Sequence, residues 1–228
     1  MPSTPRSVYV GALAAAALLG GFGLIADAVT DGDTLNLDNA VLMALRTPGN
    51  PAEPIGPSWF NEAVRDITGL GSFSVLGIVT IVVFAYLVLA GKHRTGWFMV
   101  FAVVGGTILS TVLKMLFDRP RPDLTGVAEV FTASFPSGHA TVSAVVFLTI
   151  GAMLAESSPE RPLKRFFVGV AIALTLLVGV SRIYLGVHYP TDVLAGWSLG
   201  AAWALLCTTA AHFLRERTGR PLSPEGRG

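Results

Sequence analysis

Three short stretches of this chain, far apart in the sequence, carry residue types that suit chemistry on a phosphate group. They contain Lys114 and Arg121-Pro122, then Pro136-Ser137-Gly138-His139, then Ser181-Arg182, His188 and Asp192. Cations stabilise the oxygens of a transferring phosphoryl group, and a histidine is able to attack as a nucleophile or to donate a proton. The set therefore predicts a site that binds a phosphate, attacks it and protonates the group that leaves.

The second stretch is typical of the start of a helix. Unpaired backbone N–H groups at a helix N-terminus bind anions. Ser137 is a suitable N-cap, Gly138 allows a ligand to approach the backbone, and His139 would lie in the first turn. The alternative explanation of these four residues is a capped helix start with an interfacial histidine, and the short match alone does not decide between the two.

The third stretch predicts a helix that begins near Tyr189, because Pro190 is tolerated in a first turn. His188 and Asp192 are four residues apart and would share one face. A carboxylate held against one imidazole nitrogen fixes the tautomer and leaves the other nitrogen free to attack. Arg182 would bind phosphate oxygens as a fork. The alternative is a helix-end His–Asp pair beside an arginine that reaches the membrane interface.

The first stretch places Lys114 near the end of an apolar run. A charge in a membrane span costs at least ~2.5 kcal/mol at the bilayer centre and less near the edge, so such a residue usually has a function. The prolines of Arg119-Pro120-Arg121-Pro122 should end the helix and let Arg121 turn back over the bundle. Lys114 could instead pair with Asp118, four residues on. We assign Asp118 and Arg119 supporting structural roles.

The composition predicts a membrane protein. Of 228 residues, 52% are apolar and only 14% are charged, against about 25% charged in soluble domains. Runs near the roughly 20 residues that cross a bilayer occur at about Val8–Ile25, Leu70–Ala90, Trp97–Phe117, Gly138–Ala155, Phe166–Ile183 and Val193–Leu214. We therefore predict an all-α bundle of six transmembrane helices forming a single domain over 1–228. Its catalytic core spans about 97–214, and a long outer loop, 27–69, follows the first helix.

The distribution of lysine and arginine predicts the orientation of the bundle. These residues mark cytoplasmic loops, and one side would carry Arg6, Lys92, Arg94, Arg161, Lys164, Arg165, Arg215, Arg217, Arg220 and Arg227. Both termini are therefore predicted to be cytoplasmic, in the cytoplasmic membrane. All three stretches then lie at the periplasmic or extracellular face. The first apolar run is longer than that of a signal peptide, so we expect a retained helix rather than a cleaved one.

The outer loop is predicted to contain two short helices, Leu37–Arg46 and Ser58–Thr68. Ser58 is a plausible N-cap for the second helix, and Trp59, Ala63 and Ile67 recur every four residues as an apolar stripe. This helix could be a lid at the membrane interface, with Trp59 at headgroup depth, or a covering segment packed on the bundle.

The remaining candidate residues receive no catalytic role. His93 and His212 fall on the cytoplasmic side of the predicted topology, and Cys207 lies inside the last apolar run as an inert thiol. No cluster of His, Cys and carboxylates has metal-ligand spacing, so no metal and no cofactor are expected. A net charge of +1 gives no reason to expect nucleic acid. The expected partners are a lipid phosphate and the bilayer, with no obligate protein partner.

The three stretches together resemble the type 2 phosphatidic acid phosphatase family, which shares its core with vanadium haloperoxidases. The family pattern is Lys-x6-Arg-Pro, Pro-Ser-Gly-His and Ser-Arg-x5-His-x3-Asp, and this chain matches it without departure. The resemblance implies that His188 attacks to form a phosphohistidine, Asp192 orients it and His139 protonates the leaving oxygen. It also implies that the phosphoryl oxygens are held by Lys114, Arg121, Ser137, Gly138 and Arg182, without a metal. Water would then hydrolyse the intermediate.

The expected function is a metal-independent membrane lipid phosphatase acting at the outer face. The resemblance to compact bacterial members favours undecaprenyl diphosphate as substrate, with phosphatidylglycerophosphate and phosphatidic acid as alternatives. A lipid phosphotransferase with the same intermediate is a second hypothesis. A transporter of a phosphorylated solute is disfavoured because the cations cluster at one end of the spans rather than mid-membrane. A soluble haloperoxidase is disfavoured by the apolar composition.

Overall fold

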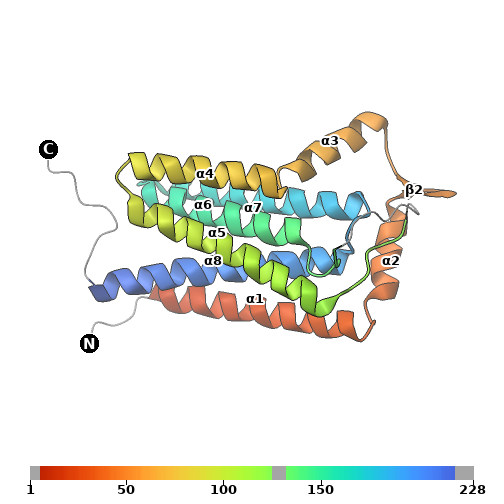
Figure 1. Ribbon diagram of the computed structural model, residues 1–228, viewed down its shortest axis with the longest axis horizontal. Helices are drawn as coiled ribbons and strands as arrows, with labels where there is room; N and C mark the ends of the chain where they lie inside the picture. Colours follow the sequence, from red (N-terminus) through yellow and green to blue (C-terminus); the bar gives the residue numbers. More distant parts are fainter. Residues whose placement is uncertain (1–5, 125–131, 219–228) are drawn as a thin grey trace.

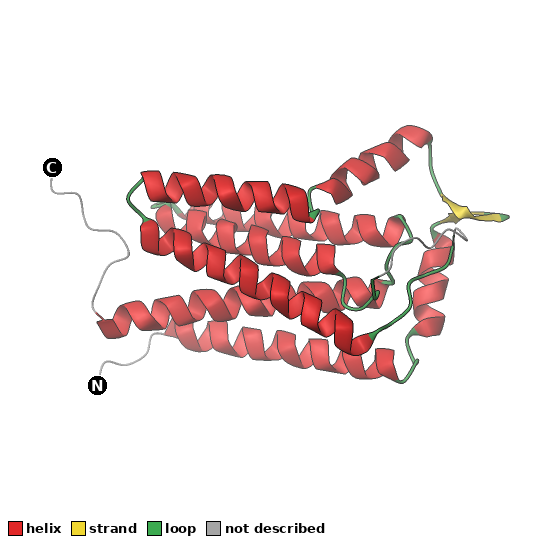
Figure 2. Ribbon diagram, viewed as in Figure 1, coloured by secondary structure: helices red, strands yellow, loops and turns green. Residues whose placement is uncertain are grey.

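The computed structural model describes residues 6–124 and 132–218. This part of the chain is helical except for one short hairpin and the connecting segments (Figures 1 and 2). The elements in chain order are α1 (Arg6–Thr30), α2 (Leu35–Ala44), β1 (Arg46–Thr47), β2 (Asn50–Pro54), α3 (Ser58–Gly69), α4 (Phe73–Leu89), α5 (His93–Phe117), α6 (Gly138–Ser157), α7 (Arg161–Tyr184) and α8 (Pro190–Thr218).

The predicted all-α membrane bundle is confirmed. Among the described residues, α1, α5, α6, α7 and α8 are long and apolar enough to cross a membrane, and α3 with α4 forms a sixth candidate that is bent by 48°. Large apolar side chains point outward along these helices, and Leu13, Ile81 and Leu116 are each more than two-thirds exposed. An apolar surface of this extent is suited to lipid rather than to water.

Helix α6 lies at the centre of the bundle, in contact with α4, α5, α7 and α8. Its close approach to α8 depends on two glycines. A Cβ atom built at Gly196 would lie 2.8 Å from the Ser137 carbonyl oxygen, and one at Gly200 would lie 2.5 Å from that of Thr141. Small residues that let backbones approach are typical of helix packing in membranes. They bring the start of α6 against the start of α8.

The two ends of the bundle differ in what they carry. Helix α1 begins and α8 ends at one end, whereas α2, the hairpin and α3 lie at the other (Figure 1). The C-terminal ends of α5 and α7 and the N-terminal ends of α6 and α8 reach this second end, so all three sequence stretches lie there. We refer to it as the site end.

The segment between α1 and α4 is more ordered than the predicted loop. Both expected helices are present as α2 and α3, but the antiparallel hairpin, which pairs Arg46 with Pro54 and Thr47 with Asn50, was not predicted. Its strands are too short to give a period-2 pattern in the sequence. Arg46 Nη2 donates to the Tyr184 carbonyl oxygen at 2.9 Å. The hairpin is thereby attached to the end of α7.

The predicted capping and apolar face of α3 are both corrected by the structure. Pro57 occupies the N-cap position, and Ser58 is the first helical residue. The face toward α7 is centred on buried Val64 and on Phe60, whose ring lies 5.3 Å from that of Tyr184. Trp59 is 67% exposed because the buried face is rotated by one residue from the predicted stripe. Helix α3 thus packs on α7, while its role as a lid stays a prediction.

Candidate active site

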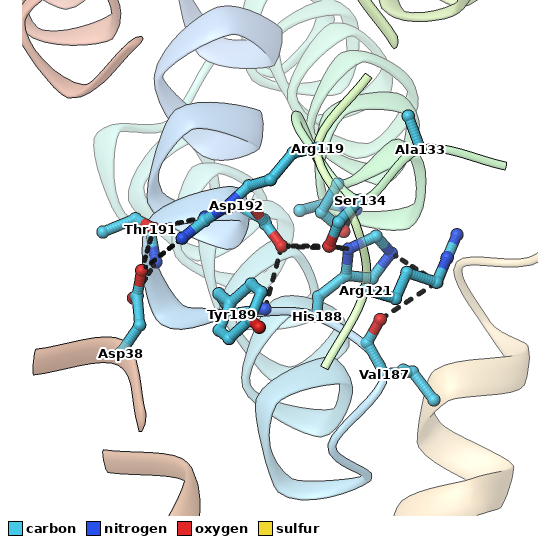
Figure 3. Close-up of polar contacts among 12 residues, drawn as sticks. Asp38, Arg119, Arg121, Ala133, Ser134, Val187, His188, Tyr189, Thr191 and Asp192 are labelled. Carbon is cyan, nitrogen blue, oxygen red and sulfur yellow. Dashed lines mark hydrogen bonds and ion pairs between the residues drawn. The ribbon is translucent and has the colours of Figure 1, made fainter. Parts of the chain in front are cut away.

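Each of the three sequence stretches lies where a bundle helix begins or ends. Helix α5 ends at Phe117 because Asp118 adopts a left-handed conformation, with φ of 40°. The chain then turns back across the site end, as the two prolines predicted. The start of α6, the end of α7 and the start of α8 complete the site, and Figure 3 shows the polar contacts at its centre.

Lys114 lies in the last turn of α5 and is directed toward the segment that precedes α6. Its Nζ atom donates to the Ala133 carbonyl oxygen at 2.7 Å. Lys114 does not form an ion pair with Asp118 among the described residues, so the alternative role suggested for Lys114, a pair with the residue four positions on, is not observed. A Cβ atom added to Gly138 would lie 3.3 Å from Lys114 Cε. The lysine therefore crosses the start of α6 at close range.

Arg121 lies over the end of the bundle and contacts His188 directly. Its Nη1 atom is 3.3 Å from His188 Nε2 and donates to the Val187 carbonyl oxygen at 3.0 Å. Its Nε and Nη2 atoms donate to the Thr132 carbonyl and hydroxyl oxygens at 2.9 and 3.0 Å. Burial lowers the pKa of the Arg121 guanidinium, whereas Asp192 acts in the opposite direction.

The start of α6 has the predicted capped geometry. The Ser137 hydroxyl accepts a hydrogen bond from the Ala140 N–H at 3.5 Å, and the Ser137 N–H donates to the Asp192 carbonyl oxygen at 2.9 Å. His139 follows in the first turn, with its ring 6.3 Å from that of Phe73. It is close enough to Arg121, Arg182 and Lys114 to interact with their charges. The motif is therefore more than a capped helix start, since it faces three cations.

Arg182 lies in the last turn of α7 and extends toward α3. Its Nη1 atom donates to the Thr68 hydroxyl at 3.1 Å. Its Nε atom is buried and has no hydrogen-bond partner among the described residues. A buried donor without a partner is uncommon in native proteins. It is available to an anion that enters the site.

His188 is buried just before α8, between Arg121 and the carboxylate of Asp192 (Figure 3). Its Nδ1 atom lies 3.5 Å from Asp192 Oδ2 and 3.3 Å from the Ser134 hydroxyl, which itself donates to Asp192 Oδ2. The pKa of His188 is lowered to about 3, chiefly by burial; Asp192 opposes this shift, and Arg121 and Lys114 add to it. The imidazole is therefore neutral at physiological pH, which the predicted role of nucleophile requires.

Arg119 lies only two residues from Arg121 but is directed away from the phosphate-binding candidates. Its Nη1 atom donates to Asp192 Oδ1 at 2.6 Å, and its Nη2 atom donates to Asp38 Oδ2 at 2.8 Å. Asp38 also accepts from the Thr191 N–H at 3.1 Å and from the Thr191 hydroxyl at 2.6 Å. Both carboxylates are fully buried. The supporting role predicted for Arg119 thus has a specific form, a bridge between α2 and α8.

Sequence reasoning missed Ser134, Asp38 and Thr191. Ser134 is three residues before Ser137, and a serine in a connecting segment carries no periodic signal. Asp38 is one of several acidic residues in the predicted outer loop, and its complete burial depends on α2 packing against α8. Only Thr191 had a local clue, because it adjoins Asp192 in the first turn of a helix.

Residues that were given no role lie apart from these contacts. His93 begins α5 at the opposite end of the bundle, and Cys207 is buried within α8. Within residues 6–124 and 132–218, no group of three or more His, Cys, Asp or Glu side chains is arranged to hold a metal ion. The charges that face the site are those of Lys114, Arg121 and Arg182, and none of them forms an ion pair with a carboxylate of the described chain.

Comparison with known proteins identifies the family. The model of the PAP2 superfamily matches residues 95–216. Phosphatidylglycerophosphatase B of Bacillus subtilis is 35% identical over 164 residues, covering 71% of this chain and 80% of the relative. Undecaprenyl-diphosphatase of Sulfolobus acidocaldarius is 35% identical over 104 residues, covering 45% of this chain and 46% of the relative.

A solved structure extends this similarity to the whole fold. The crystal structure of a transmembrane PAP2 type phosphatidylglycerolphosphate phosphatase from Bacillus subtilis matches with a TM-score of 0.79 at 30% identity, covering 88% of this chain and 96% of the other. The motifs, the bundle and these matches agree. The chain therefore belongs to the PAP2 superfamily and is a membrane phosphatase.

Proposed function

We propose that this phosphatase hydrolyses a phosphate monoester on a glycerolipid, with phosphatidylglycerophosphate as the leading substrate. The sequence alone placed undecaprenyl diphosphate first. The similarity to phosphatidylglycerophosphatase B, over 71% of this chain, and to a solved phosphatidylglycerolphosphate phosphatase, over 88%, favours phosphatidylglycerophosphate instead.

One observation carries the proposed chemistry. Three cations, Lys114, Arg121 and Arg182, act on His139, two of them, Arg121 and Lys114, also act on His188, and none of the three forms an ion pair with a carboxylate of the described chain. Uncompensated charge in a buried site is costly unless a ligand of opposite sign is bound. A phosphoryl group supplies that sign and has three oxygens to share among the cations. Electrostatic stabilisation of those oxygens is the main requirement for phosphoryl transfer.

The proposed reaction has two steps. The lone pair on His188 Nε2 attacks phosphorus, the bond from phosphorus to the lipid oxygen breaks, and protonated His139 gives its proton to that oxygen. The lipid alcohol, which is phosphatidylglycerol for the leading substrate, then leaves with its hydroxyl restored. In the second step water attacks the phosphohistidine, His139 takes a proton from the water, and the N–P bond breaks to release inorganic phosphate. Gly138 would offer its backbone N–H, and Ser137 its hydroxyl, to the same oxygens.

We further propose that the site end faces the exterior or the periplasm, with both termini in the cytoplasm. The loop between α4 and α5 carries Lys92, and the start of α7 carries Arg161, Lys164 and Arg165, all at the end opposite the site. Excess lysine and arginine in short loops is typical of the cytoplasmic side. Cysteine accessibility to a membrane-impermeant reagent, measured on single-cysteine variants at the exposed positions Ser157 and Asn50 in a Cys207→Ala background, tests this orientation.

The function is tested by phosphate release from purified protein in detergent containing EDTA. The panel is phosphatidylglycerophosphate, phosphatidic acid, undecaprenyl diphosphate and a water-soluble phosphate ester, each with His188→Ala as control. We expect release to be fastest from phosphatidylglycerophosphate, to persist in EDTA and to be lost in the variant. Release by His188→Ala at the wild-type rate would overturn the proposed nucleophile.

The covalent intermediate is tested separately by rapid quenching with a substrate labelled in its phosphate. We expect labelled protein whose phosphate is stable to base and labile to acid, as a phosphoramidate bond requires. Transfer of the label to an added lipid alcohol, with no inorganic phosphate, would favour the phosphotransferase hypothesis instead.

Undecaprenyl diphosphate remains a second candidate substrate because of the similarity to an undecaprenyl-diphosphatase over 45% of this chain. That similarity is shorter than the one to phosphatidylglycerophosphatase B. The ratio of kcat/KM for the two lipids, measured in the same detergent, decides between them. A ratio that favours undecaprenyl diphosphate would restore the order that the sequence alone suggested.

A further inference from the structure

The Ser134 side chain lies beside the contact between His188 and Asp192. The direct separation of His188 Nδ1 and Asp192 Oδ2 is 3.5 Å, slightly longer than the distance from Nδ1 to the Ser134 hydroxyl. The Ser134 hydroxyl lies 3.3 Å from Nδ1 and donates to Oδ2 (Figure 3). Ser134 is fully buried, and its own N–H donates to the Arg119 carbonyl oxygen at 2.7 Å. The backbone bond fixes where the hydroxyl lies.

We propose that Ser134 is a positioning residue that connects Asp192 to His188 and holds the tautomer needed for attack. This inference rests on the proposed function of His188 as nucleophile. The chain of hydrogen bonds runs from the Nδ1–H of His188 to the Ser134 oxygen, and from the Ser134 O–H to Asp192 Oδ2. Asp192 then acts on the imidazole through this hydroxyl as well as across the direct separation of 3.5 Å.

The directions of these bonds follow from what each group is able to donate. A carboxylate only accepts, so the Ser134 proton is directed toward Asp192. The Ser134 oxygen then has lone pairs to offer, and Nδ1 must be the donor. A neutral imidazole with a proton on Nδ1 has a lone pair on Nε2.

The other side of the ring gives the same assignment independently. Arg121 Nη1 lies 3.3 Å from Nε2, and a guanidinium has donors only. Nε2 is therefore an acceptor in this arrangement. The nitrogen with the lone pair faces the cation that would hold the phosphate.

Both carboxylate oxygens of Asp192 accept hydrogen bonds from groups other than the His188 ring. Oδ1 accepts from Arg119, and Oδ2 accepts from the Tyr189 N–H at 2.9 Å as well as from Ser134. These bonds hold the carboxylate in place without a short contact to the ring. When Nε2 bonds to phosphorus, the imidazole becomes cationic, and its Nδ1–H bond to Ser134 strengthens while no proton leaves the ring.

The first experiment compares Ser134→Ala with Ser143→Ala in the full-length protein in detergent. Ser143 is an equally buried serine, whose hydroxyl donates to the Ala140 carbonyl oxygen at 3.3 Å within α6, so it controls for the loss of a buried hydroxyl. With phosphatidylglycerophosphate, we expect Ser134→Ala to lower kcat and the single-turnover rate about 10- to 100-fold. KM should stay within about threefold of wild type, because the phosphate-binding cations are unchanged. Ser143→Ala should match wild type.

A second measurement does not depend on turnover. Nitrogen-15 NMR of histidine-labelled protein, in a His93→Gln/His212→Gln background with His188→Ala for assignment, reports which ring nitrogen of His188 carries the proton. We expect protonated Nδ1 in the wild-type sequence and a mixture of tautomers in Ser134→Ala. Ser134→Thr, which keeps the hydroxyl, should restore the wild-type tautomer.

The outcomes separate this inference from the proposed function. If wild type is active and His188→Ala is inactive, but Ser134→Ala equals Ser143→Ala in rate and tautomer, the role of Ser134 is overturned and the nucleophile stands. If no lipid phosphate is hydrolysed, the proposed function fails, and the NMR result alone decides whether Ser134 sets the tautomer. Should Ser134→Ala fail to fold, an unchanged tautomer in Ser134→Cys, whose thiol is a weak donor, would overturn the role.

Discussion

Arg119 and Arg121 are two residues apart, yet they belong to regions of opposite electrostatic character. Arg119 joins the carboxylate side of the site, formed with Asp38, Thr191 and Asp192, where both ends of its guanidinium meet a buried carboxylate. Arg121 joins the phosphate side, formed with Lys114 and Arg182, where the described residues contribute backbone and hydroxyl acceptors, and an imidazole, but no carboxylate.

The difference shows that two arginines in the same short segment have different roles: one is paired with carboxylates, and the other keeps its charge. A buried cation that is fully paired fixes the positions of its partners, and its charge is no longer available to a ligand. A cation that bonds only to neutral oxygens keeps its charge for an anion. His188 and Asp192 lie at the boundary between the two regions (Figure 3). The comparison therefore predicts that removing charge on one side damages the fold, whereas removing it on the other damages catalysis.

The largest effect is expected for Arg119→Met. This change leaves Asp38 and Asp192 buried without their cation, which should lower the free energy of unfolding by about 3–5 kcal/mol. Thermal unfolding and size-exclusion chromatography in detergent measure the loss. Arg121→Met is the matched control and should cost only about 1 kcal/mol. Equal losses from the two variants would contradict the division into two regions.

The next effect is the loss of activity in Arg121→Met, in protein that remains folded. Removing one donor that stabilises developing charge costs about 100- to 1,000-fold in kcat in other enzymes. We expect a loss of this size, measured as phosphate release from phosphatidylglycerophosphate. Arg65→Met, at an exposed position of α3, controls for the removal of a positive charge at the site end. A wild-type rate in Arg121→Met would mean that the phosphate binds elsewhere.

A smaller effect is expected for Asp38→Asn. The substitution preserves the size of the side chain but removes the charge that Arg119 and Thr191 contact, which should destabilise the fold by about 1.5–3 kcal/mol. Asp66→Asn, on the exposed face of α3, is the matched control. Among the described residues, Asp38 is connected to Asp192 through Arg119 and Thr191 and does not contact the phosphate-binding cations, so KM should change little. A large rise in KM would show instead that Asp38 acts on the phosphate side.

The most subtle prediction concerns the protonation of His188. Its pKa is lowered from 6.5 to about 3 by burial, with Asp192 opposing and Arg121 adding to the shift. A lowered pKa keeps the imidazole neutral as the pH falls through 6.5, so attack should not be lost there. Nitrogen-15 NMR, with the His188→Ala difference spectrum for assignment, should show a neutral ring down to about pH 5. A ring that titrates near 6.5 would contradict this burial.

Much of the fold was predictable because apolar run length and charge placement are local properties. The predicted spans correspond to α1 and α4–α8, and the proline pair correctly ended α5 before Arg121. The predictions that were wrong concern the segment between α1 and α4, where Ser58 proved to be helical rather than an N-cap and the apolar face of α3 is centred on Val64. These features depend on contact with α7, which no local pattern contains.

The site was predictable to the same extent and for the same reason. His188 and Asp192, which are one helix turn apart in the sequence, lie in contact as expected. Ser137 caps α6, also as expected. The predicted contact of His188 with Asp192 is present at 3.5 Å, and the Ser134 hydroxyl, which was not predicted, lies beside it and contacts both groups. The catalytic roles of these residues stay predictions until the variants are measured.

The sequence by itself determined the membrane class, the three motifs and the end of the bundle at which they lie. These follow from residue type and short-range spacing, which the backbone geometry of a helix converts directly into position. Only the tertiary structure decided which cations are paired and which are free. Asp38 reaches Thr191 across 153 residues, and Ser134 reaches Asp192 across 58. Such contacts arise from the packing of separate helices, so no local spacing specifies them.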